Sequence, residues 1–319
     1  MNNAQLTTAE PGRISPADIT QAVEFFANSQ DVKPTTRNLY RRTLTLFFDW
    51  VRDTGRTLGA LILPDLITYK EELLKNGKTS LTVASYVNSL RRFYDWAEAN
   101  KIYPNIAKGL HAPKRAQAFR KQPLTVAQVA DLLTAEHQGA SLRDFAIVNL
   151  LVRTGLRCIE VVRADVGDIT YKGGRRVLMI QGKGRDQKDN FVILTDAAYT
   201  PIAEYLNTRR DNGPKSPLFA SNSNNNQGGR LTTRAVSEIA KKGLVSVGLN
   251  NRVYTAHSLR HTTAVNILRA GGTLEQVQYT LRHSNPATTQ IYTATLREEQ
   301  RLNDGGELML DRLYSAATV

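Results

Sequence analysis

Three of the five histidines in this sequence fall within a short stretch near the C-terminus, among several arginines. His257 and His261 are spaced i, i+4, so on a helix both rings would lie on one face. With His283 as a third ligand they could bind zinc. However, Arg260 and Arg282 lie beside them and would repel a divalent cation. We therefore expect no metal, while a purely structural role for any one of the histidines stays open.

An anionic guest explains the same residues better. The guanidinium of Arg260 is a planar fork that fits phosphate oxygens, and the imidazole of His257 adds a hydrogen bond at neutral pH. Both residues stand at the expected start of a helix, where free backbone N–H groups also favour an anion. A phosphate group is therefore the predicted occupant.

A second arginine follows a helix break. Thr154 and Gly155 interrupt a strongly apolar helix, and Arg157 begins the next one. Glu160, one turn later, could hold Arg157 or a neighbouring histidine, because a buried charge normally requires a partner. Cys158, the single cysteine, is expected to be a small buried residue rather than a nucleophile.

The elements that must position these residues are predicted to be mostly helical. After the middle of the chain, apolar residues recur at helical spacing over 125–135, 141–152, 196–209, 233–244, 258–269, 274–281 and 286–292. Two β-rich runs, 176–181 and 190–194, flank Gly182-Lys183-Gly184 and predict a β-hairpin. The polar run 221–229 predicts a loop.

The N-terminal part of the chain is also predicted to be helical, over 15–29, 35–54 and 79–100. Two pairs of arginines lie on the polar faces of these helices. Arg37 and Arg41 are one turn apart, and Arg91 and Arg92 are adjacent. We treat these four as candidate phosphate contacts, with a purely solvent-facing role as the alternative.

Positive charge is concentrated between and after these helices. The chain has a formal net charge of +13, and the stretch 107–122 has no apolar periodicity and predicts an interdomain linker. Its second part, 114–122, carries four basic residues and no acidic one: Lys114, Arg115, Arg120 and Lys121. A basic linker could lie along phosphates, because Lys and Arg contacts release counterions. A solvated flexible linker is the alternative.

Composition excludes several classes of protein. With 41% hydrophobic and 22% charged residues, the chain is typical of a globular protein and long enough for about two domains. One cysteine excludes an internal disulfide framework, which favours a reducing cytosol. The polar N-terminus and the absence of a long apolar run predict a cytoplasmic protein without a membrane segment.

Taken together, these motifs resemble those of the tyrosine recombinases, the phage integrase family. The resemblance spans roughly 15–295 and rests on Thr154-Gly-Leu-Arg157 with Glu160, Gly182-Lys-Gly184, His257-Ser-Leu-Arg260-His261, and Leu281-Arg-His283 followed by Tyr292. It is closest to the two-domain Xer-like or small mobile-element type. The resemblance implies an all-α, SAM-like core-binding domain and a mainly α catalytic domain with a small β-hairpin or sheet, closing as a C-shaped clamp on double-stranded DNA.

The domain boundaries expected on this basis are a flexible N-terminus at 1–14, a core-binding domain at 15–106, the linker at 107–122, a catalytic domain at 123–295 and a tail at 296–319. The tail is acidic and has apolar residues at helical spacing, among them Leu308 and Leu313. It is therefore expected to contact a neighbouring protomer, with a helix packed on its own domain as the alternative.

The resemblance also implies the reaction. Arg157 and Arg260 would bind the non-bridging phosphate oxygens, and His257 and His283 would donate hydrogen bonds. Tyr292 would attack phosphorus to give a 3′-phosphotyrosyl link. Lys183 would protonate the leaving 5′ oxygen, and Glu160 would support the site. No cofactor is implied. Asn285 and Pro286 predict a short helix that presents Tyr292 near its end as an exposed residue.

Two departures from the family pattern concern this region. Arg282 stands where the family often has glycine, so it is expected to add a phosphate or protein contact or to alter that turn. Tyr292 is followed by Thr293-Ala rather than Thr-His. By resemblance, a further helix near residue 232 lies against DNA and carries four candidate DNA contacts: Arg230, Arg234, Lys241 and Lys242.

Family members act as tetramers that pass through a Holliday junction, so we expect a homotetramer on paired sites, a monomer without DNA, and possibly an accessory protein or a second recombinase. The outcome would be integration, excision, resolution or inversion. Two other functions remain open at this point: a relaxing enzyme similar to type IB topoisomerases, and a catalytically idle DNA-binding relative.

Overall fold

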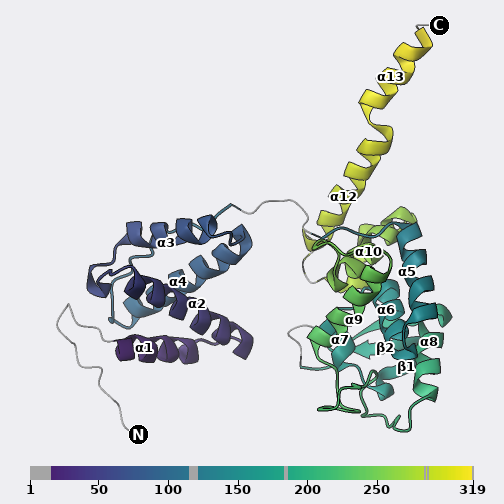
Figure 1. The fold of residues 1–319 in the computed structure, drawn as a ribbon, viewed down its shortest axis with the longest axis horizontal. Coiled ribbons are helices and arrows are strands. Elements are labelled where there is room, and N and C mark those ends of the chain that lie inside the picture. Colours follow the sequence, from purple (N-terminus) through teal and green to yellow (C-terminus); the bar gives the residue numbers. More distant parts are fainter. Residues whose placement is uncertain (1–15, 115–120, 183–185, 284, 286, 318–319) are drawn as a thin grey trace. The chain divides into compact units, whose positions relative to one another are not determined.

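The computed structural model describes residues 16–114, 121–182, 186–283, 285 and 287–317. The chain divides into two compact units, Met1–Ala118 and Phe119–Val319, which are drawn in Figure 1. The division falls within the stretch 107–122 that the sequence predicts to be a linker. Each unit has its own hydrophobic core and is described separately.

The N-terminal unit consists of helices in its described part: α1 (Pro16–Ser29), α2 (Pro34–Asp53), α3 (Leu63–Lys75) and α4 (Ser80–Ala99), with a 3-10 turn at Leu58–Ala60. The three predicted helices are confirmed within a residue or two. Helix α3 was not predicted. It begins with Pro64 in its first turn, and the Asp65 carboxylate accepts a hydrogen bond from the N–H of Ile62 at 3.0 Å, which caps the helix.

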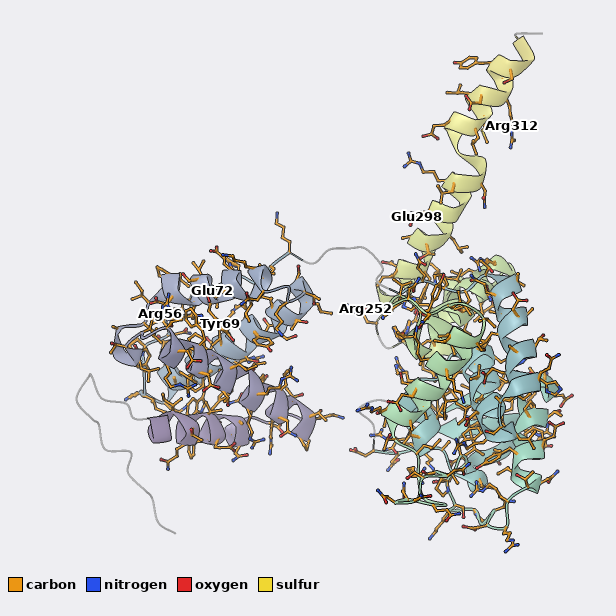
Figure 2. The ribbon with its side chains drawn as sticks, in the orientation of Figure 1. Arg56, Tyr69, Glu72, Arg252, Glu298 and Arg312 are labelled. Carbon is orange, nitrogen blue, oxygen red and sulfur yellow. The ribbon has the colours of Figure 1, made fainter. Side chains whose placement is uncertain are left out.

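Aromatic side chains fill the core of this unit. Phe26 and Phe47 are fully buried, and Phe93 packs edge-on against Phe26. At its periphery the indole of Trp50 donates a hydrogen bond to Glu72 at 2.7 Å, and Arg56 lies over the Trp50 ring. Figure 2 labels Arg56 and Glu72 in this unit. The hydrogen bond from Trp50 to Glu72 joins α2 to α3.

The C-terminal unit has a helical body and one small sheet. Its helices are α5 (Val126–Gly139), α6 (Leu142–Thr154), α7 (Cys158–Arg163), α8 (Asp196–Asn207), α9 (Thr233–Ser246), α10 (Ala256–Arg269), α11 (Leu274–Leu281), α12 (Ala287–Asp304) and α13 (Gly306–Ala317), with a 3-10 turn at Val166–Asp168. Its strands are β1 (Ile169–Lys172), β2 (Arg175–Ile180) and β3 (Asn190–Ile193). The predicted fold class, mainly helical with a small antiparallel sheet, is confirmed.

The sheet has the order β1-β2-β3 and is antiparallel throughout. Leu178 pairs with Val192, so the predicted hairpin between β2 and β3 is confirmed. Strand β1 was not predicted. It joins β2 through Gly173 and Gly174, which have φ values of 57° and 74°, as a two-residue hairpin turn requires.

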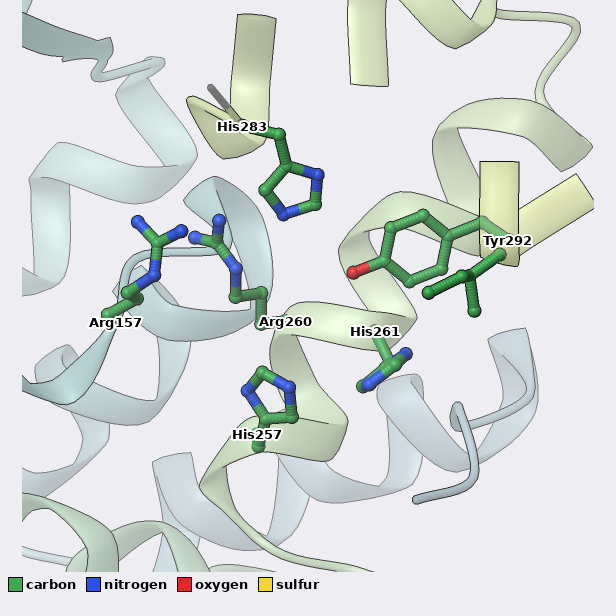
Figure 3. Close-up of a pocket in the computed structure, with 7 residues that line it drawn as sticks. Arg157, His257, Arg260, His261, His283 and Tyr292 are labelled. Atoms are coloured by element: carbon green, nitrogen blue, oxygen red, sulfur yellow. The ribbon is translucent and has the colours of Figure 1, made fainter. Parts of the chain in front are cut away.

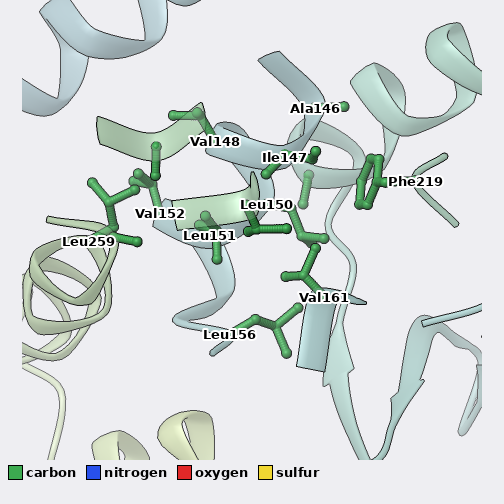
Figure 4. Close-up of a cluster of buried hydrophobic side chains, with 14 of the residues drawn as sticks. Ala146, Ile147, Val148, Leu150, Leu151, Val152, Leu156, Val161, Phe219 and Leu259 are labelled. Carbon is green, nitrogen blue, oxygen red and sulfur yellow. The ribbon is translucent and has the colours of Figure 1, made fainter. Parts of the chain in front are cut away.

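Helix α6 is the centre of this unit. Its apolar residues from Ala146 to Val152 are buried, as Figure 4 shows for Ile147, Leu150 and Leu151. The helix ends at Gly155, which has a φ of 60°. A Cβ at Gly155 would lie 2.5 Å from a methyl group of Leu281, so glycine is required there. This close approach brings the α6–α7 turn, which carries Arg157, against the end of α11.

Helix α10 is fastened to its neighbours by buried hydroxyl groups. Thr263 Oγ1 donates to the carbonyl of Val152 at 2.8 Å, and Thr262 Oγ1 accepts from the N–H of Leu124 at 2.8 Å. Because buried polar groups left without partners would be costly, these bonds fix α10 against α6 and against the segment before α5. The residues on the first turns of α10 are thereby held in a defined place.

The last predicted helix is longer than expected. The prediction of a short helix ending near Tyr292 is wrong, because α12 continues to Asp304. The expected boundary between 295 and 296 therefore falls inside α12, and Pro286 lies outside the described residues. In the part of the chain that the structure describes, no helix is long and apolar enough to cross a membrane.

Candidate active site

The histidines and arginines of the sequence motifs meet at one pocket of about 230 Å³. It is lined by Arg157, His257, Arg260, His261, His283, Ile291 and Tyr292. These residues come from the α6–α7 turn, α10, the second residue after α11, and α12. Figure 3 shows the guanidinium groups of Arg157 and Arg260 side by side, with the ring of Tyr292 across the pocket.

Arg260 is the most deeply buried charged side chain of the pocket, with 2% exposure. Its Nη1 donates to the carbonyl of Gly155 at 2.5 Å, and its Nη2 donates to the carbonyl of Leu281. Burial, together with the charges of Arg157 and Arg282, lowers the pKa of Arg260 to about 9. The group therefore remains a cation at neutral pH, held in a fixed orientation by two elements.

Arg157 is held by the carboxylate of Glu160, for which the sequence predicted either Arg157 or a neighbouring histidine as the partner. Arg157 Nη1 donates to Glu160 Oε1 at 2.8 Å, and the backbone N–H of Arg157 donates to Oε2 at 2.8 Å. Glu160 is fully buried. Burial alone would raise its pKa, but Arg282 and Arg157 hold the pKa of Glu160 below its ordinary value. Glu160 is therefore an anion that orients Arg157 towards the pocket.

Arg282 makes the second ion pair with Glu160. Its Nη2 lies 2.9 Å from Glu160 Oε2, and its Nη1 donates to the carbonyl of Thr280 at 2.5 Å. The residue also has a left-handed backbone, with a φ of 56°. Of the alternatives expected for Arg282, the structure shows the protein contact, which Arg282 makes from a left-handed residue at the end of α11.

His283 is held by hydrogen bonds to its imidazole ring and to its backbone. Its Nδ1 hydrogen-bonds to Thr289 Oγ1 at 2.9 Å, and Gln278 bonds the backbone of His283 through both N–H and carbonyl. The His283 ring stacks on Tyr292 with centroids 6.1 Å apart. Burial and the nearby Arg260 lower the pKa of His283 to about 4. Its imidazole is therefore neutral at pH 7.

His257 and His261 form an edge-on pair with centroids 4.8 Å apart, and His261 packs edge-on against Tyr292 at 5.2 Å. Burial lowers the pKa of both imidazoles, that of His261 to about 3. Both are neutral at pH 7. Among the described residues, no group of three or more histidine, cysteine, aspartate or glutamate side chains is arranged to hold a metal ion.

Tyr292 is buried, so the prediction of an exposed side chain is wrong. Its exposure is 3%, and it belongs to an apolar cluster with Val265, Val277 and Leu281. Helix α12 continues past it, and Leu296 of α12 packs against the same cluster. The hydroxyl points into the pocket in Figure 3. Burial raises the pKa of Tyr292, and the charges of Arg260 and Arg157 oppose that rise.

Lys183 lies outside the described residues. The chain on either side is anchored to the body of the unit. Arg163 Nη1 donates to the carbonyl of Gly182 at 3.2 Å, and Lys188 pairs with Asp165 at 2.6 Å.

The predicted DNA contacts of the N-terminal unit and linker fall into two groups. Arg91, Arg92 and Lys114 are exposed. Arg41 pairs with Glu24 at 2.9 Å, and Arg37 donates to the carbonyl of Gln30 at 3.2 Å. Lys121 donates to the carbonyl of Arg252 at 2.7 Å. Arg115 and Arg120 lie outside the described residues.

The four candidates around α9 divide in the same way. Arg230 donates to the carbonyl of Val162 at 2.7 Å, and Lys241 donates to three backbone carbonyls of the loop before α10, including that of Asn251 at 2.9 Å. These two side chains therefore have structural partners within the unit. Arg234 and Lys242 are exposed, and Arg234 pairs with Glu238 on the same helix.

Sequence reasoning missed Ile291 and Thr289, and it named His261 without a role in the proposed reaction. His261 and Ile291 line the pocket, and Thr289 holds His283. His261 was singled out as one of three clustered histidines, but nothing in its spacing indicated contact with Tyr292. Thr289 lies three residues before Tyr292, a spacing that places both on one face of α12. That spacing was the available signal.

Comparison with known proteins identifies the class. Residues 122–299 match the phage integrase family, and residues 23–101 match the phage integrase N-terminal SAM-like domain. Because the first match alone covers more than half of the chain, the protein belongs to the phage integrase family.

Individual relatives are tyrosine recombinases. The chain is 30% identical over 302 residues to tyrosine recombinase XerD of Rhizobium meliloti (strain 1021), which covers 91% of this chain and 94% of that protein. It is 33% identical over 222 residues to tyrosine recombinase XerC of Actinobacillus pleuropneumoniae serotype 7, covering 69% of each.

Two solved structures share the fold. The first is the XerH site-specific recombinase bound to palindromic difH substrate in a post-cleavage complex, with a TM-score of 0.72 and 18% identity over 91% of this chain and 84% of that one. The second is a lambda integrase dimer bound to a COC′ core site, with a TM-score of 0.70 and 15% identity over 88% and 78%.

Proposed function

We propose that this protein is a site-specific recombinase that cleaves and rejoins double-stranded DNA through a 3′-phosphotyrosyl intermediate. The observation that carries the proposal is the pocket itself, where the Tyr292 hydroxyl points towards the paired guanidinium groups of Arg157 and Arg260. A phosphodiester bound between them would meet its nucleophile and its charge-stabilising groups together.

In this mechanism the two arginines bind the non-bridging oxygens of the scissile phosphate. Arg260 is fixed by backbone carbonyls and Arg157 by Glu160, so both are oriented before DNA arrives. The neutral imidazoles of His257 and His283 each have one N–H to donate as negative charge builds up. Removing one such preorganised donor typically costs about 3–4 kcal/mol of transition-state stabilisation.

The covalent step exchanges one phosphate ester for another. Tyr292 Oη forms a bond to phosphorus while the bond from phosphorus to the 5′ oxygen breaks. The tyrosine loses its proton, and the departing 5′ oxygen gains one, which we assign to Lys183 acting as general acid. The reverse reaction, with a 5′ hydroxyl from another strand, rejoins the DNA. No cofactor takes part in this scheme, and a Holliday junction forms between the two exchanges.

For binding of the duplex, we assign phosphate contacts first to the exposed candidates Arg91, Arg92, Lys114, Arg234 and Lys242. In this scheme the two units close as a clamp on DNA, with the basic linker along the backbone. The salt dependence of binding reports the number of such contacts, because each neutralised phosphate releases counterions.

We propose a homotetramer on paired sites, formed from monomers when DNA is bound, in which the tail contacts a neighbouring protomer. Leu308, Met309, Leu313 and Tyr314 of α13 are all exposed, and Leu302 of α12 is 74% exposed. Such an apolar surface along a helix is suited to a protein contact. A second recombinase or an accessory protein are alternative partners for the same surface.

The test is trapping of a covalent adduct. The protein is incubated with a pool of nicked suicide duplexes whose sequence is randomised around the nick, and DNA that stays protein-bound after denaturation is sequenced. We expect adducts with one shared sequence. Sequence-independent adducts would instead indicate a relaxing enzyme, and no adduct would reject the proposal.

Tyr292→Phe is the decisive variant, because it keeps the ring and removes the nucleophile. It should give no adduct. Tyr279→Phe is the matched control, since Tyr279 is 69% exposed and its hydroxyl pairs with Glu275 at 2.8 Å. An adduct that persists in Tyr292→Phe would reject Tyr292 as the nucleophile.

A further inference from the structure

We infer that Arg282 is a positioning residue of the phosphate pocket. It shares the carboxylate of Glu160 with Arg157, so the arginine cluster keeps a second net positive charge that can stabilise the transition state. The inference rests on the proposed function. It concerns a residue at which this chain departs from the family pattern.

The backbone at Arg282 is costly for an arginine. The residue has φ 56° and ψ 48° and ends α11 in the left-handed conformation. Glycine is preferred at this position of a helix end, and a residue with a Cβ costs about 1–2 kcal/mol more. Within the described residues, Lys101 is the other non-glycine residue with positive φ. An arginine kept in this conformation therefore has contacts that offset the strain.

Those contacts direct the side chain into the protein rather than towards solvent. The Arg282 side chain has 6% exposure, and its Nη2 meets Glu160 Oε2 at 2.9 Å. The other oxygen of the same carboxylate meets Arg157 at 2.8 Å. Both oxygens of a fully buried carboxylate are thus occupied by arginine, which leaves Glu160 one orientation and fixes Arg157 through it.

Sharing one carboxylate changes the charge of the pocket. Three guanidinium groups, those of Arg157, Arg260 and Arg282, are compensated by one carboxylate, so the cluster has two net positive charges. With glycine at position 282, Glu160 would neutralise one of the two remaining arginines and leave one. A phosphodiester has one negative charge, whereas the pentavalent transition state of its cleavage approaches two. Arg282 is therefore suited to favour the transition state over the bound substrate.

The other titratable groups of the pocket add no charge at neutral pH. Burial and the arginines lower the pKa of His261 and His283 to about 3 and 4. The arginines consequently supply the positive charge that faces the phosphate. Arg282 would act through Glu160 and through its field, since it does not line the pocket itself.

The test compares two substrates that differ in charge. Single-turnover cleavage by wild type and Arg282→Gly is measured on a nicked duplex with an ordinary scissile phosphodiester, and on one with a methylphosphonate, which lacks one negative charge. We expect Arg282→Gly to be about tenfold slower than wild type on the phosphodiester, but within about threefold on the methylphosphonate. Arg282→Lys, which keeps the charge, should recover part of the phosphodiester rate.

Each alternative gives a different result. If the Arg282 side chain only packs the end of α11 against α7, Arg282→Gly loses the same factor on both substrates, and this result overturns the inference. An unchanged rate on the phosphodiester also overturns it. The ratio between substrates is independent of the fraction of folded enzyme, so partial unfolding does not imitate the expected result. If wild type forms no adduct on either substrate, the proposed function itself fails.

Lys101→Gly provides the matched control. Lys101 is an exposed basic residue of the N-terminal unit with a φ of 58°, so its replacement removes the same charge and the same kind of backbone strain from a residue outside the Glu160 cluster. We expect it to cleave both substrates at the wild-type rate.

Discussion

The two sides of the pocket are built in different ways. On one side, Arg157 and Arg260 are held by hydrogen bonds and ion pairs to Glu160 and to backbone carbonyls. On the other side, the ring of Tyr292 is held by apolar packing with Val265 and Val277. The groups that would bind phosphate are thus fixed by a polar network, and the nucleophile is fixed by the position of α12. Substitutions on the arginine side should lower the cleavage rate directly, because they remove groups that bind the phosphate. Substitutions on the tyrosine side should lower it indirectly, by shifting α12 or the groups packed against it.

The largest effect is expected on the arginine side. Arg260→Lys should lower single-turnover cleavage by about 10²- to 10³-fold, because lysine lacks the fork that bonds two carbonyls and an oxygen of the phosphate. DNA binding should change little, since other phosphate contacts supply most of it. The measurement is adduct formation at saturating protein, together with a filter-binding titration.

Arg269→Lys is the control for this change. Arg269 lies on the same helix, but its guanidinium donates to the carbonyl of Leu124 at 3.3 Å, away from the pocket. The Arg269→Lys variant should cleave DNA at the wild-type rate. Equal rates for Arg260→Lys and wild type would show that the polar network is not the basis of phosphate activation.

A smaller loss is expected on the tyrosine side. Thr289→Val removes the hydrogen bond to His283 Nδ1 and leaves the ring free to change orientation and tautomer. By analogy with groups that orient catalytic histidines, cleavage should fall about 10-fold or somewhat more. DNA affinity should stay the same, which single-turnover kinetics and a binding titration would separate.

Thr293→Val on the same helix is the control. The hydroxyl of Thr293 is buried and has no hydrogen-bond partner among the residues that the structure describes. Its replacement by a methyl group should be neutral or slightly stabilising, because an unsatisfied buried hydroxyl carries a desolvation cost. If both threonine variants lose the same activity, the effect belongs to the packing of α12 and not to His283.

Acid should weaken the fold through the tyrosine side. The pKa of His283 is about 4, below the ordinary value of about 6.5 for histidine. Between these pH values the unfolded chain binds more protons than the folded protein. The contribution of His283 to the free energy of unfolding is therefore fully present above pH 6.5 and is lost as the pH falls towards 4. The loss from this group should be about 3 kcal/mol, measured by urea denaturation at several pH values.

His283→Asn should flatten this pH dependence, and His111→Gln, at an exposed histidine of the other unit, should leave it unchanged. The same slope in His283→Asn and wild type would mean that other groups control the acid sensitivity.

The sequence was informative where local signals decide the structure. Helix α11 has the predicted bounds, Leu274–Leu281, because Thr273 caps it by accepting from the N–H of Gln276. The pattern around β2 and β3 was equally clear. Strand β1 was missed although Gly173-Gly174 is a hairpin signal, because its strand is short and largely exposed.

Contacts between distant residues were beyond such reasoning. Arg282 and Glu160 are 122 residues apart, and their ion pair exists because the end of α11 meets α7. The burial of Tyr292 likewise depends on α12 packing against α10 and α11, which the apolar spacing up to residue 292 did not indicate. The residues of the site were found through their resemblance to a family, and their mutual support was found in the structure.

The smallest effect on chemistry is expected from the tail, which extends the tyrosine side as α13. Deletion of residues 308–319 removes exposed apolar residues such as Leu313 and Tyr314 but none that touches the pocket. Cleavage of a single nicked site should stay within about twofold, since the helix of Tyr292 is retained. Assembly on paired sites, measured by light scattering with DNA, and complete recombination should both fall. A truncated protein that assembles and recombines like wild type would mean that α13 serves its own protomer, and the tyrosine side would then end at α12.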